Sequence, residues 1–394
     1  MKKVLVPSVR FKRFSEEWKE EKIESFSKIT IGEFVIKTKQ NDFYEYPVYN
    51  GGITNTGFYK EYNNEGNKII VSARGANAGH INFIEKKYWA GNSCYSIDLI
   101  SNRQRDIKFI FYSMLINKNK FDDNKQVGTI PSVSLEDVRN FIIYFASYSE
   151  QQKIGKLLDQ ISNLITLEQS KLNKLKQLKE TLLQKMFPEG NSKTPRIRFK
   201  GFEGEWKEYK FNDIGSYYST SSLSYNDLSK GGQYKCVLYG ELYTKYNERI
   251  FNVISRTNKK ITLTQPNDIL FPTSTTVDPY SLISPSCVNE ENVMTGGDLF
   301  GIRPYKNING NFISYYINNV EYIKNKLANK AQGLTIIHLY YKNILNENLY
   351  IASLEEQNKI AKLFVKIDTI INLYQSKLNK LEQIKKALLQ KMFV

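Results

Sequence analysis

The stretch QSKLNKLKQLKETLLQKMF at residues 169–187 returns almost unchanged at residues 375–393, as QSKLNKLEQIKKALLQKMF. Extended toward the N-terminus, residues 150–187 align without a gap with residues 356–393, at an offset of 206 and with 24 identities in 38 positions. Self-similarity over such a length indicates that one structural plan is used twice in the chain.

The repeated stretches carry apolar residues with the heptad spacing of a coiled coil, over about five heptads. A helix cannot bury such a seam alone, so it needs a partner. We predict that the two helices pair with each other as an antiparallel coiled coil; dimerisation of the protein through the seam is the alternative. Both copies lapse at the same d position, which holds Lys179 and Lys385. The residues expected to pair the helices are Ile154, Leu158, Ile161, Ile165, Leu172, Leu175, Leu182, Ile360, Phe364, Ile367, Ile371, Leu378, Leu381 and Leu388.

A second repeat opens each half of the chain. PSVRFKRFSEEWKE begins at Pro7 and PRIRFKGFEGEWKE begins at Pro195, at an offset of 188. Between each opener and its helix lies a variable block rich in Tyr, Phe, Ile and Asn, with short extended runs such as NKIIVSA at residues 67–73. Such blocks are typical of α+β globules.

The predicted fold is therefore α+β, with two globular domains separated by two long helices in a pseudo-twofold internal repeat. Ser149 and Ser353, each followed by glutamates, are the expected N-caps of the helices. We call the two globular domains block 1 and block 2. The predicted segments are block 1 at 1–149, a helix at 150–187, a linker at 188–195, block 2 at 196–355 and a helix at 356–394.

Composition limits the class of protein. The net charge of +16 and the pI of about 9.3 favour polyanionic partners. Three dispersed cysteines without a CxxC pair, and only two histidines, argue against a disulfide framework or a zinc site and indicate a reducing cytoplasm. The apolar run at the start stops at Pro7, and no run of 18 apolar residues follows, so neither secretion nor a membrane span is expected.

This order of opener, block and helix, written twice, resembles the specificity subunit of Type I restriction-modification systems over essentially the whole chain. The resemblance is carried by the EQxKI starts at residues 150–154 and 356–360, the LLQKMF ends at 182–187 and 388–393, and the RFKRF and RFKGF openers with their tryptophans. It implies that the blocks are target recognition domains, each of which reads one half of a split DNA target.

The resemblance also implies partners and cofactors. The helices would set the gap between the half-targets and dock two adenine methyltransferase subunits, and restriction subunits would join that core in a bacterial cytoplasm. S-adenosylmethionine, ATP and magnesium are then expected only on the partner subunits, with no cofactor in this chain. Two alternatives stay open: a specificity subunit of a system with fused methylation and cleavage, and a coiled-coil scaffold without DNA selectivity.

Catalytic motifs are missing from the sequence. No glycine-rich loop of the kind that binds S-adenosylmethionine opens a helix, and DPYS at residues 278–281 lacks the second proline of a base-clamping motif. ExK occurs at residues 17–19 and 205–207, beside the opener tryptophans, where packing is the better interpretation; no Walker A sequence is present. We therefore predict a subunit that performs no catalysis and holds no metal.

Candidate DNA contacts are polar side chains on glycine-containing loops, because base edges and phosphates are bound by Arg, Lys, Asn, Gln, Ser and Thr. Arg74 and Asn77 lie on the turn VSARGANAGHINF, whose glycines equally fit a purely structural tight turn. A Gln followed by Gly precedes both helices, at Gln126 and Gln332, which suggests a shared element. The further candidates are Tyr49, Asn50, Asn55, Lys118, Lys120, Lys125, Thr273, Ser274, Thr275, Thr276 and Lys330.

Overall fold

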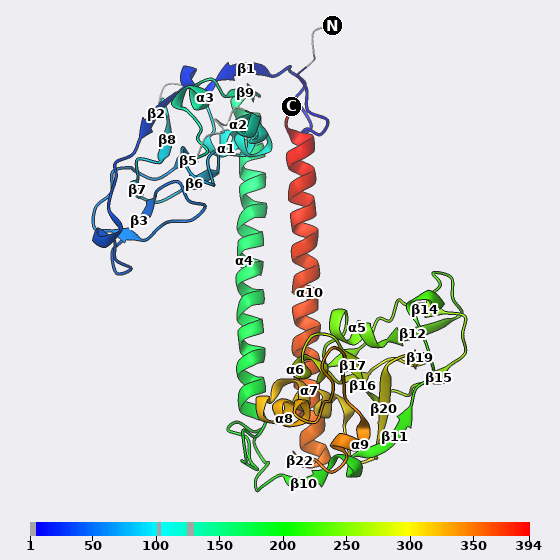
Figure 1. Cartoon of the computed structure of the whole chain (residues 1–394). Helices are drawn as coiled ribbons and strands as arrows, with labels where there is room; N and C mark the ends of the chain where they lie inside the picture. The colour runs from blue at the N-terminus through cyan, green and yellow to red at the C-terminus, as the bar shows by residue number, and fades with distance from the viewer. Residues whose placement is uncertain (1–4, 101–103, 124–129) are drawn as a thin grey trace. The chain divides into compact units, whose positions relative to one another are not determined.

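The computed structural model describes residues 5–100, 104–123 and 130–394, and the chain divides into two compact units (Figure 1). Unit 1 comprises residues 1–170 and 375–394, and unit 2 comprises residues 171–374. The two long helices are α4 (Tyr148–Met186) and α10 (Leu354–Met392). Each unit therefore joins one block to the start of one long helix and to the end of the other, a division that cuts across the five predicted segments.

Both units are built around the same kind of sheet. In unit 1 the strand order is β2-β8-β5-β6, and in unit 2 it is β11-β20-β16-β18-β13. The central strands read IIV in β5 and ILF in β16, and these residues are buried, as expected where both faces of a sheet are covered. The bounds in unit 1 are β2 (Ser27–Ile31), β5 (Lys68–Ser72), β6 (Ile81–Ile84) and β8 (Cys94–Leu99). Those in unit 2 are β11 (Gly215–Ser219), β13 (Arg249–Ile250), β16 (Ile269–Pro272), β18 (Ser286–Val288) and β20 (Leu299–Pro304).

A second, smaller sheet in each unit contains a parallel pair. Its order is β4-β3-β7 in unit 1 and β14-β12-β19-β15 in unit 2. The bounds are β3 (Tyr46–Tyr49), β4 (Phe58–Tyr59), β7 (Trp89–Ala90), β12 (Tyr234–Leu238), β14 (Arg256–Thr257), β15 (Thr262–Leu263) and β19 (Val293–Gly296). A short pair, β17 (Ser274–Thr275) with β21 (Ile337–His338), completes unit 2.

Short helices cover these sheets. Asp106 and Asn309 cap α1 and α7 by accepting hydrogen bonds from the backbone N–H of Phe109 and Phe312, as short polar residues do at helix starts. In unit 1 the helices are α1 (Ile107–Ile116), α2 (Asn119–Asp123) and α3 (Leu135–Arg139). In unit 2 they are α5 (Tyr239–Thr244), α6 (Pro279–Leu282), α7 (Gly310–Asn319), α8 (Glu321–Ala328) and α9 (Tyr341–Ile344).

The opener strand of each half pairs with the last strand before the long helix. β1 (Lys19–Lys22) pairs with β9 (Ile142–Phe145), and β10 (Lys207–Lys210) pairs with β22 (Asn348–Ile351). The registers, Lys19 opposite Phe145 and Lys207 opposite Ile351, are related by the same offsets of 188 and 206 that relate the sequences. The extra length of block 2 is therefore accommodated inside the block, between two joints of fixed geometry.

Glutamate in the EQxKI start holds the opener. Arg10 donates from Nε and Nη2 to Glu150 at 2.8 and 2.6 Å, and Arg198 does the same to Glu356 at 2.8 and 2.7 Å. Such bidentate pairs fix both partners in orientation. Hydrogen bonding to the carboxylate raises the pKa of each arginine.

Glutamine in the same start fastens the block. Gln151 donates to the Ala146 carbonyl at 2.8 Å and accepts from the Asp106 N–H at 3.0 Å, and Gln357 makes the matching bonds at 2.9 Å each, to Ala352 and Asn309. The dipeptide thus ties each long helix to its own opener and to its own block.

The LLQKMF ends are held by the other copy. In unit 1, Phe393 of the second repeat packs edge-on against the opener Trp18, and in unit 2, Phe187 of the first repeat packs edge-on against Trp206. The Lys391 carbonyl accepts from the Val9 N–H at 2.9 Å, and the Lys185 carbonyl accepts from the Ile197 N–H at 2.8 Å. Since the last carbonyls of a helix have no intrahelical partner, these bonds satisfy them. Within each unit, the start of one helix thus lies beside the end of the other, and the predicted α+β fold with antiparallel helices and an internal repeat is confirmed.

The predicted seam contributes to two cores. Ile154 and Leu158 lie in the core of unit 1 with Met392 and Phe393, and Leu388 packs on it half-buried. The core of unit 2 contains Ile360, Phe364 and Ile367 with Met186 and Phe187, and Leu182 and Ile371 pack on it. Leu172 and Leu378 are buried, whereas Ile161, Ile165, Leu175 and Leu381 are half-buried.

The predicted N-cap Ser149 is wrong, because α4 starts at Tyr148 and Ser149 lies inside it. The counterpart of Ser353 at the offset of 206 is Ser147, whose carbonyl accepts from the N–H groups of Glu150 and Gln151 at 3.0 Å. Ser353 itself does act as a cap, since its Oγ accepts from the Glu356 N–H at 3.3 Å. The two serines near the start of α4 are two residues apart, and only the alignment of the repeats distinguishes them.

Candidate nucleic-acid interface

In unit 1 the loop that follows the central strand β5 carries Arg74. Its neighbours Gly75 and Gly79 have φ angles of +93° and +82°, a region that favours glycine, so the turn does require them. The turn is tied to the segment before α3, because the Val133 N–H donates to the Ala73 carbonyl at 2.9 Å and the Gly75 N–H donates to the Pro131 carbonyl at 3.0 Å. No hydrogen bond or ion pair joins the exposed Arg74 side chain to any residue that the structure describes. A rigid turn therefore presents a guanidinium to solvent.

The predicted loop at residues 48–60 lies beside this turn. Asn50 Oδ1 accepts from the Ser93 N–H at 3.4 Å, and the Ser93 carbonyl accepts from the Ala73 N–H at 2.8 Å. Asn50 and Arg74 thus lie on adjacent segments on either side of Ser93. Asn77, which is half-buried, belongs to the same turn as Arg74.

The other candidates in block 1 differ in how far they are engaged within the fold. Tyr49 is half-buried, packs edge-on against Tyr88 at 5.9 Å between ring centroids, and has its pKa raised by burial. Asn55 donates to the Gly57 carbonyl at 3.4 Å. Lys118 is exposed, whereas Lys120 is half-buried with its ammonium 5.4 Å from the Phe141 ring centroid. Lys125 and Gln126 lie outside the described residues.

In unit 2 the four consecutive hydroxyls follow the central strand β16. Ser274 is buried and its Oγ donates to Asp298 Oδ2 at 2.7 Å, so this hydroxyl serves the fold. Thr275 Oγ1 accepts from the Val277 N–H at 3.2 Å, Thr273 is half-buried, and Thr276 is exposed. Of the four, Thr276 is the one presented to solvent.

The second Gln-Gly loop folds back on these hydroxyls. Gln332 exchanges backbone hydrogen bonds with His338 at 2.8 and 2.7 Å, and His338 pairs with Ser274 between β21 and β17. Gln332 is exposed and Gly333 has a φ of +126°. Lys330 is held by Glu347, at 2.8 Å from Nζ to Oε1. The structure thus brings Gln332 and Thr276 to one edge of unit 2.

These two loop pairs occupy equivalent places. The Leu339 N–H donates to the Thr273 carbonyl at 2.9 Å, as the Val133 N–H does to Ala73. Arg74 bridges Ser132 as Ser274 pairs with His338, and the second member of each pair is related by the repeat offset of 206. The RGANAG turn of block 1 and the hydroxyl loop of block 2 are therefore the same element with different side chains, a correspondence that sequence reasoning missed.

Exposed apolar residues at this edge were also missed. Ile130 and Ile336, which the offset of 206 relates, are 64% and 49% exposed, and Leu334 is 99% exposed. Single exposed apolar residues are common on protein surfaces and need no explanation. An exposed isoleucine at the same position of both repeats is instead a feature of the repeated structure. The recurrence of Thr-Ile in the aligned sequences was the available signal.

Residues that resemble catalytic motifs have structural roles. Asp278 of DPYS caps α6 by accepting from the Ser281 N–H at 2.8 Å, a bond that lowers the pKa of Asp278. The ExK motifs flank Trp18 and Trp206, which are buried. Burial raises the pKa of Cys94 and of Cys236 to about 11, so both thiols stay protonated. Among the described residues there is no cluster of three or more His, Cys, Asp or Glu side chains able to hold a metal, and no helix long and apolar enough to span a membrane.

Comparison with known proteins gives a consistent result. The family model of the Type I restriction modification DNA specificity domain matches residues 15–177 and again residues 203–383. The putative type I specificity subunit S.MgeORF438P of Mycoplasma genitalium is 25% identical over 195 residues, which is 47% of this chain and 51% of that protein. The specificity subunit of the Type I restriction enzyme MjaVIII of Methanocaldococcus jannaschii is 22% identical over 333 residues, 82% of this chain and 77% of that protein.

A solved structure shares the fold. The S subunit of a Type-I restriction-modification system from M. genitalium superposes with a TM-score of 0.73 at 18% identity, over 99% of both chains. The match to the first curated relative spans only about half of that relative's length, at 51%.

Proposed function

Because the chain belongs to the family of Type I restriction modification DNA specificity domains, whose model matches it twice, we propose that it is the specificity subunit of such a system. Each unit reads one half of a bipartite double-stranded DNA target. The observation that carries this proposal is the duplicated edge: in both units a polar loop after the central strand is bonded to the segment that precedes the long helix.

The candidate polar groups of the two blocks suit DNA. Arg74 has the planar fork that binds the major-groove edge of guanine, and Asn77 and Asn50 beside it have amides that suit adenine. Thr276, Gln332 and Lys118 suit phosphates or base edges in the same way. The net charge of +16 supplies the attraction that a polyanion needs.

The long helices are the proposed docking surface for two methyltransferase subunits, with restriction subunits joining that core. Residues 150–187 carry 7 Lys against 4 acids, and residues 356–393 carry 8 Lys against 3, which together give +8, half of the net charge. Such charge attracts an acidic partner surface or the DNA between the half-targets. S-adenosylmethionine, ATP and magnesium belong to the partner subunits in this proposal.

Methylome sequencing tests the proposal. The chain is expressed with its methyltransferase partner in a host without other adenine methylation, and each component is also expressed alone. A bipartite methylated motif is expected only when both are present. Methylation by the purified chain alone would contradict the non-catalytic assignment, and equal methylation with and without the chain would favour the scaffold alternative.

A further inference from the structure

Lys179, which occupies a d position of the heptad seam in place of an apolar residue, takes part in an ion-pair network in unit 2. Lys179 Nζ lies 2.8 Å from Asp368 Oδ1 on α10 and 3.4 Å from Glu248 Oε2, which belongs to block 2 between α5 and β13. The three side chains are only 18%, 17% and 10% exposed. One ammonium thus joins both long helices to the block.

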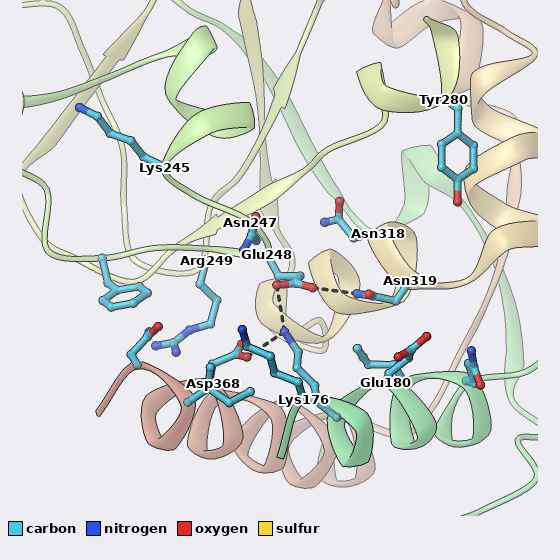
Figure 2. A pocket seen from close by; sticks show the side chains of 16 residues that line it. Lys176, Glu180, Lys245, Asn247, Glu248, Arg249, Tyr280, Asn318, Asn319 and Asp368 are labelled. Carbon is cyan, nitrogen blue, oxygen red and sulfur yellow. Dashed lines mark hydrogen bonds and ion pairs between the residues drawn. The ribbon is translucent and has the colours of Figure 1, made fainter. Parts of the chain in front are cut away.

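Neutral donors complete the network. Tyr315 of α7 donates its hydroxyl to Asp368. Asn319 Nδ2 donates to Glu248 Oε1 at 2.9 Å (Figure 2). Burial raises the pKa of Tyr315, which keeps its hydroxyl a donor. Because each carboxylate also receives a donor from α7, the network fixes the orientation of this helix as well as that of the loop.

A cavity of about 640 Å³ lies next to the network. Its lining includes Lys176, Asn247, Arg249 and Tyr280, and Figure 2 shows Glu248 directed from block 2 toward the helices. Lys179 and Asp368 of the long helices and Glu248 of block 2 all line this cavity. The ion pairs of Lys179 therefore join the segment around Glu248 to the helices at the wall of the cavity.

In unit 1 the lysine at the equivalent d position has different contacts. Lys385 is the counterpart of Lys179, and Ser162 is the counterpart of Asp368, both at the offset of 206. Ser162 shares a hydrogen bond of 2.8 Å with Tyr112, while Lys385 Nζ lies 5.7 Å from the Tyr112 ring centroid and has no ion pair among the residues that the structure describes.

The cation of unit 1 comes instead from the block. Lys108 of α1 lies 2.7 Å from Asp159 of α4 and 2.7 Å from Glu85. Burial alone would lower the pKa of Lys108, but these two carboxylates outweigh it and raise the pKa. Block 1 is thus joined to its helix with the charges exchanged.

We propose that Lys179 is a positioning residue that holds block 2 at a fixed orientation on the two helices through Asp368 and Glu248, and thereby sets which gap between half-targets the protein accepts. The role of Lys179 in the choice of gap rests on the proposed function, whereas its role in the orientation of block 2 does not.

Hydrogen exchange on the full chain tests the orientation. Lys179→Met is compared with Lys179→Arg, which keeps the charge, and with Lys385→Met, the matched position in unit 1. In Lys179→Met, amides of residues 245–250 are expected to exchange at least tenfold faster, with wild-type rates in the other two variants. Wild-type rates in Lys179→Met, or equally fast exchange in Lys179→Arg, would overturn the proposal.

A second variant covers failure of Lys179→Met to fold. Glu248→Gln keeps the shape of the side chain and removes the charge that block 2 contributes, so it should accelerate exchange in the same segment. Unchanged exchange in a folded Glu248→Gln protein would show that the network does not hold the block.

DNA binding tests the gap. Complexes with the methyltransferase partner are titrated with targets that share both half-sites and differ in their gap by one or two base pairs. Lys179→Met is expected to lose at least fivefold in selectivity for the cognate gap, with unchanged affinity for a target holding only the half-site of block 2.

The hydrogen-exchange and DNA-binding experiments together distinguish failure of the proposed role of Lys179 from failure of the proposed function. If hydrogen exchange accelerates but gap selectivity stays at the wild-type value, Lys179 orients block 2 but does not determine the accepted gap. If the wild-type complex does not discriminate between targets at all, the proposed function fails, and the exchange experiment alone decides the role of Lys179.

Discussion

Unit 1 and unit 2 have the same arrangement of sheet, opener and long helices, yet their sequences agree mainly where the opener and the block contact the long helices. The opener strand, the bidentate Arg–Glu pair, the bridging glutamine and the capped helix end recur with equal geometry. The edge loops and the polar contacts between block and helix differ, as Arg74 against Ser274 and Lys385 against Lys179 show. The comparison teaches that the joint between the opener and the long helix is the same in both units, whereas the edge loops and the ion pairs between block and helix are particular to each unit.

The largest expected effect comes from exchanging a block. Replacement of residues 20–149 by the corresponding block of another family member keeps the joints at Arg10 and Glu150. It should change one half of the methylated motif completely and leave the other half as it was, because the edge loops of unit 2 are untouched. Methylome sequencing reads out both halves, and a change in both would show that the units do not read independently.

The joint itself should be the next most sensitive. Arg198→Ala leaves the Glu356 carboxylate, which is 1% exposed, without its partner, and breaking a buried pair costs about 3–5 kcal/mol. Arg10→Ala should cost about the same, since Glu150 is fully buried in the same geometry. Urea denaturation of both variants measures this, with Arg10→Lys and Arg198→Lys as controls that keep the charge but lose the fork. Unequal losses would show that the two joints are not equivalent.

These joints also explain how far the sequence could predict the fold. The heptads and the duplicated openers determine the two helices and the internal repeat, because both signals are local. The contact partners of these residues were not predicted: Arg10 and Glu150 are 140 residues apart, and Lys179 and Glu248 are 69 apart. Which residues meet over such separations depends on strand pairing inside the blocks, where the two sequences have diverged.

The candidate site shows the same limit. Arg74 lies on a turn as predicted, whereas Ser274 and Thr275 form strand β17. The equivalence of the two segments depends on hydrogen bonds from Val133 and Leu339. Ser274 was a candidate DNA contact, whereas its hydroxyl is buried and donates to Asp298, a partner 24 residues away. Composition of a loop predicts which chemistry is present, and only the packing decides which hydroxyl reaches solvent.

An intermediate effect on DNA binding is expected at that edge. Arg74→Ala should weaken binding to the cognate target by about 1–3 kcal/mol, the range for a bidentate contact with guanine. Ser274→Ala, at the equivalent place in unit 2, should lower stability by about 1 kcal/mol through its lost bond to Asp298 and leave sequence selectivity intact. Affinities for cognate and random DNA at one salt concentration decide: an equal loss on both DNAs for Arg74→Ala would make it a phosphate contact.

The smallest effect is expected at Lys385, and its sign is opposite to that of most core substitutions. Burial lowers the pKa of Lys385 below its ordinary value of 10.5, with the charge of Asp159 offsetting part of this. Between the lowered pKa and 10.5 the unfolded chain binds more protons than the folded one, so the free energy of unfolding rises with pH in that window. Lys385→Met removes a desolvated charge that has no ion-pair partner among the described residues, and should therefore be neutral or stabilise the protein by less than about 1 kcal/mol at pH 7.

The pH dependence separates this explanation from a simple gain in packing. Denaturant unfolding at pH 7 and at pH 10.5 should show the advantage of Lys385→Met shrinking at the higher pH, because the wild-type lysine loses its proton at a lower pH in the folded than in the unfolded chain. An advantage that is the same at both pH values would assign the gain to packing of the methionine side chain. A loss of about 2 kcal/mol or more at pH 7 would mean that Lys385 makes an ion pair comparable with that of Lys179, and the contrast between the two units would disappear at this position.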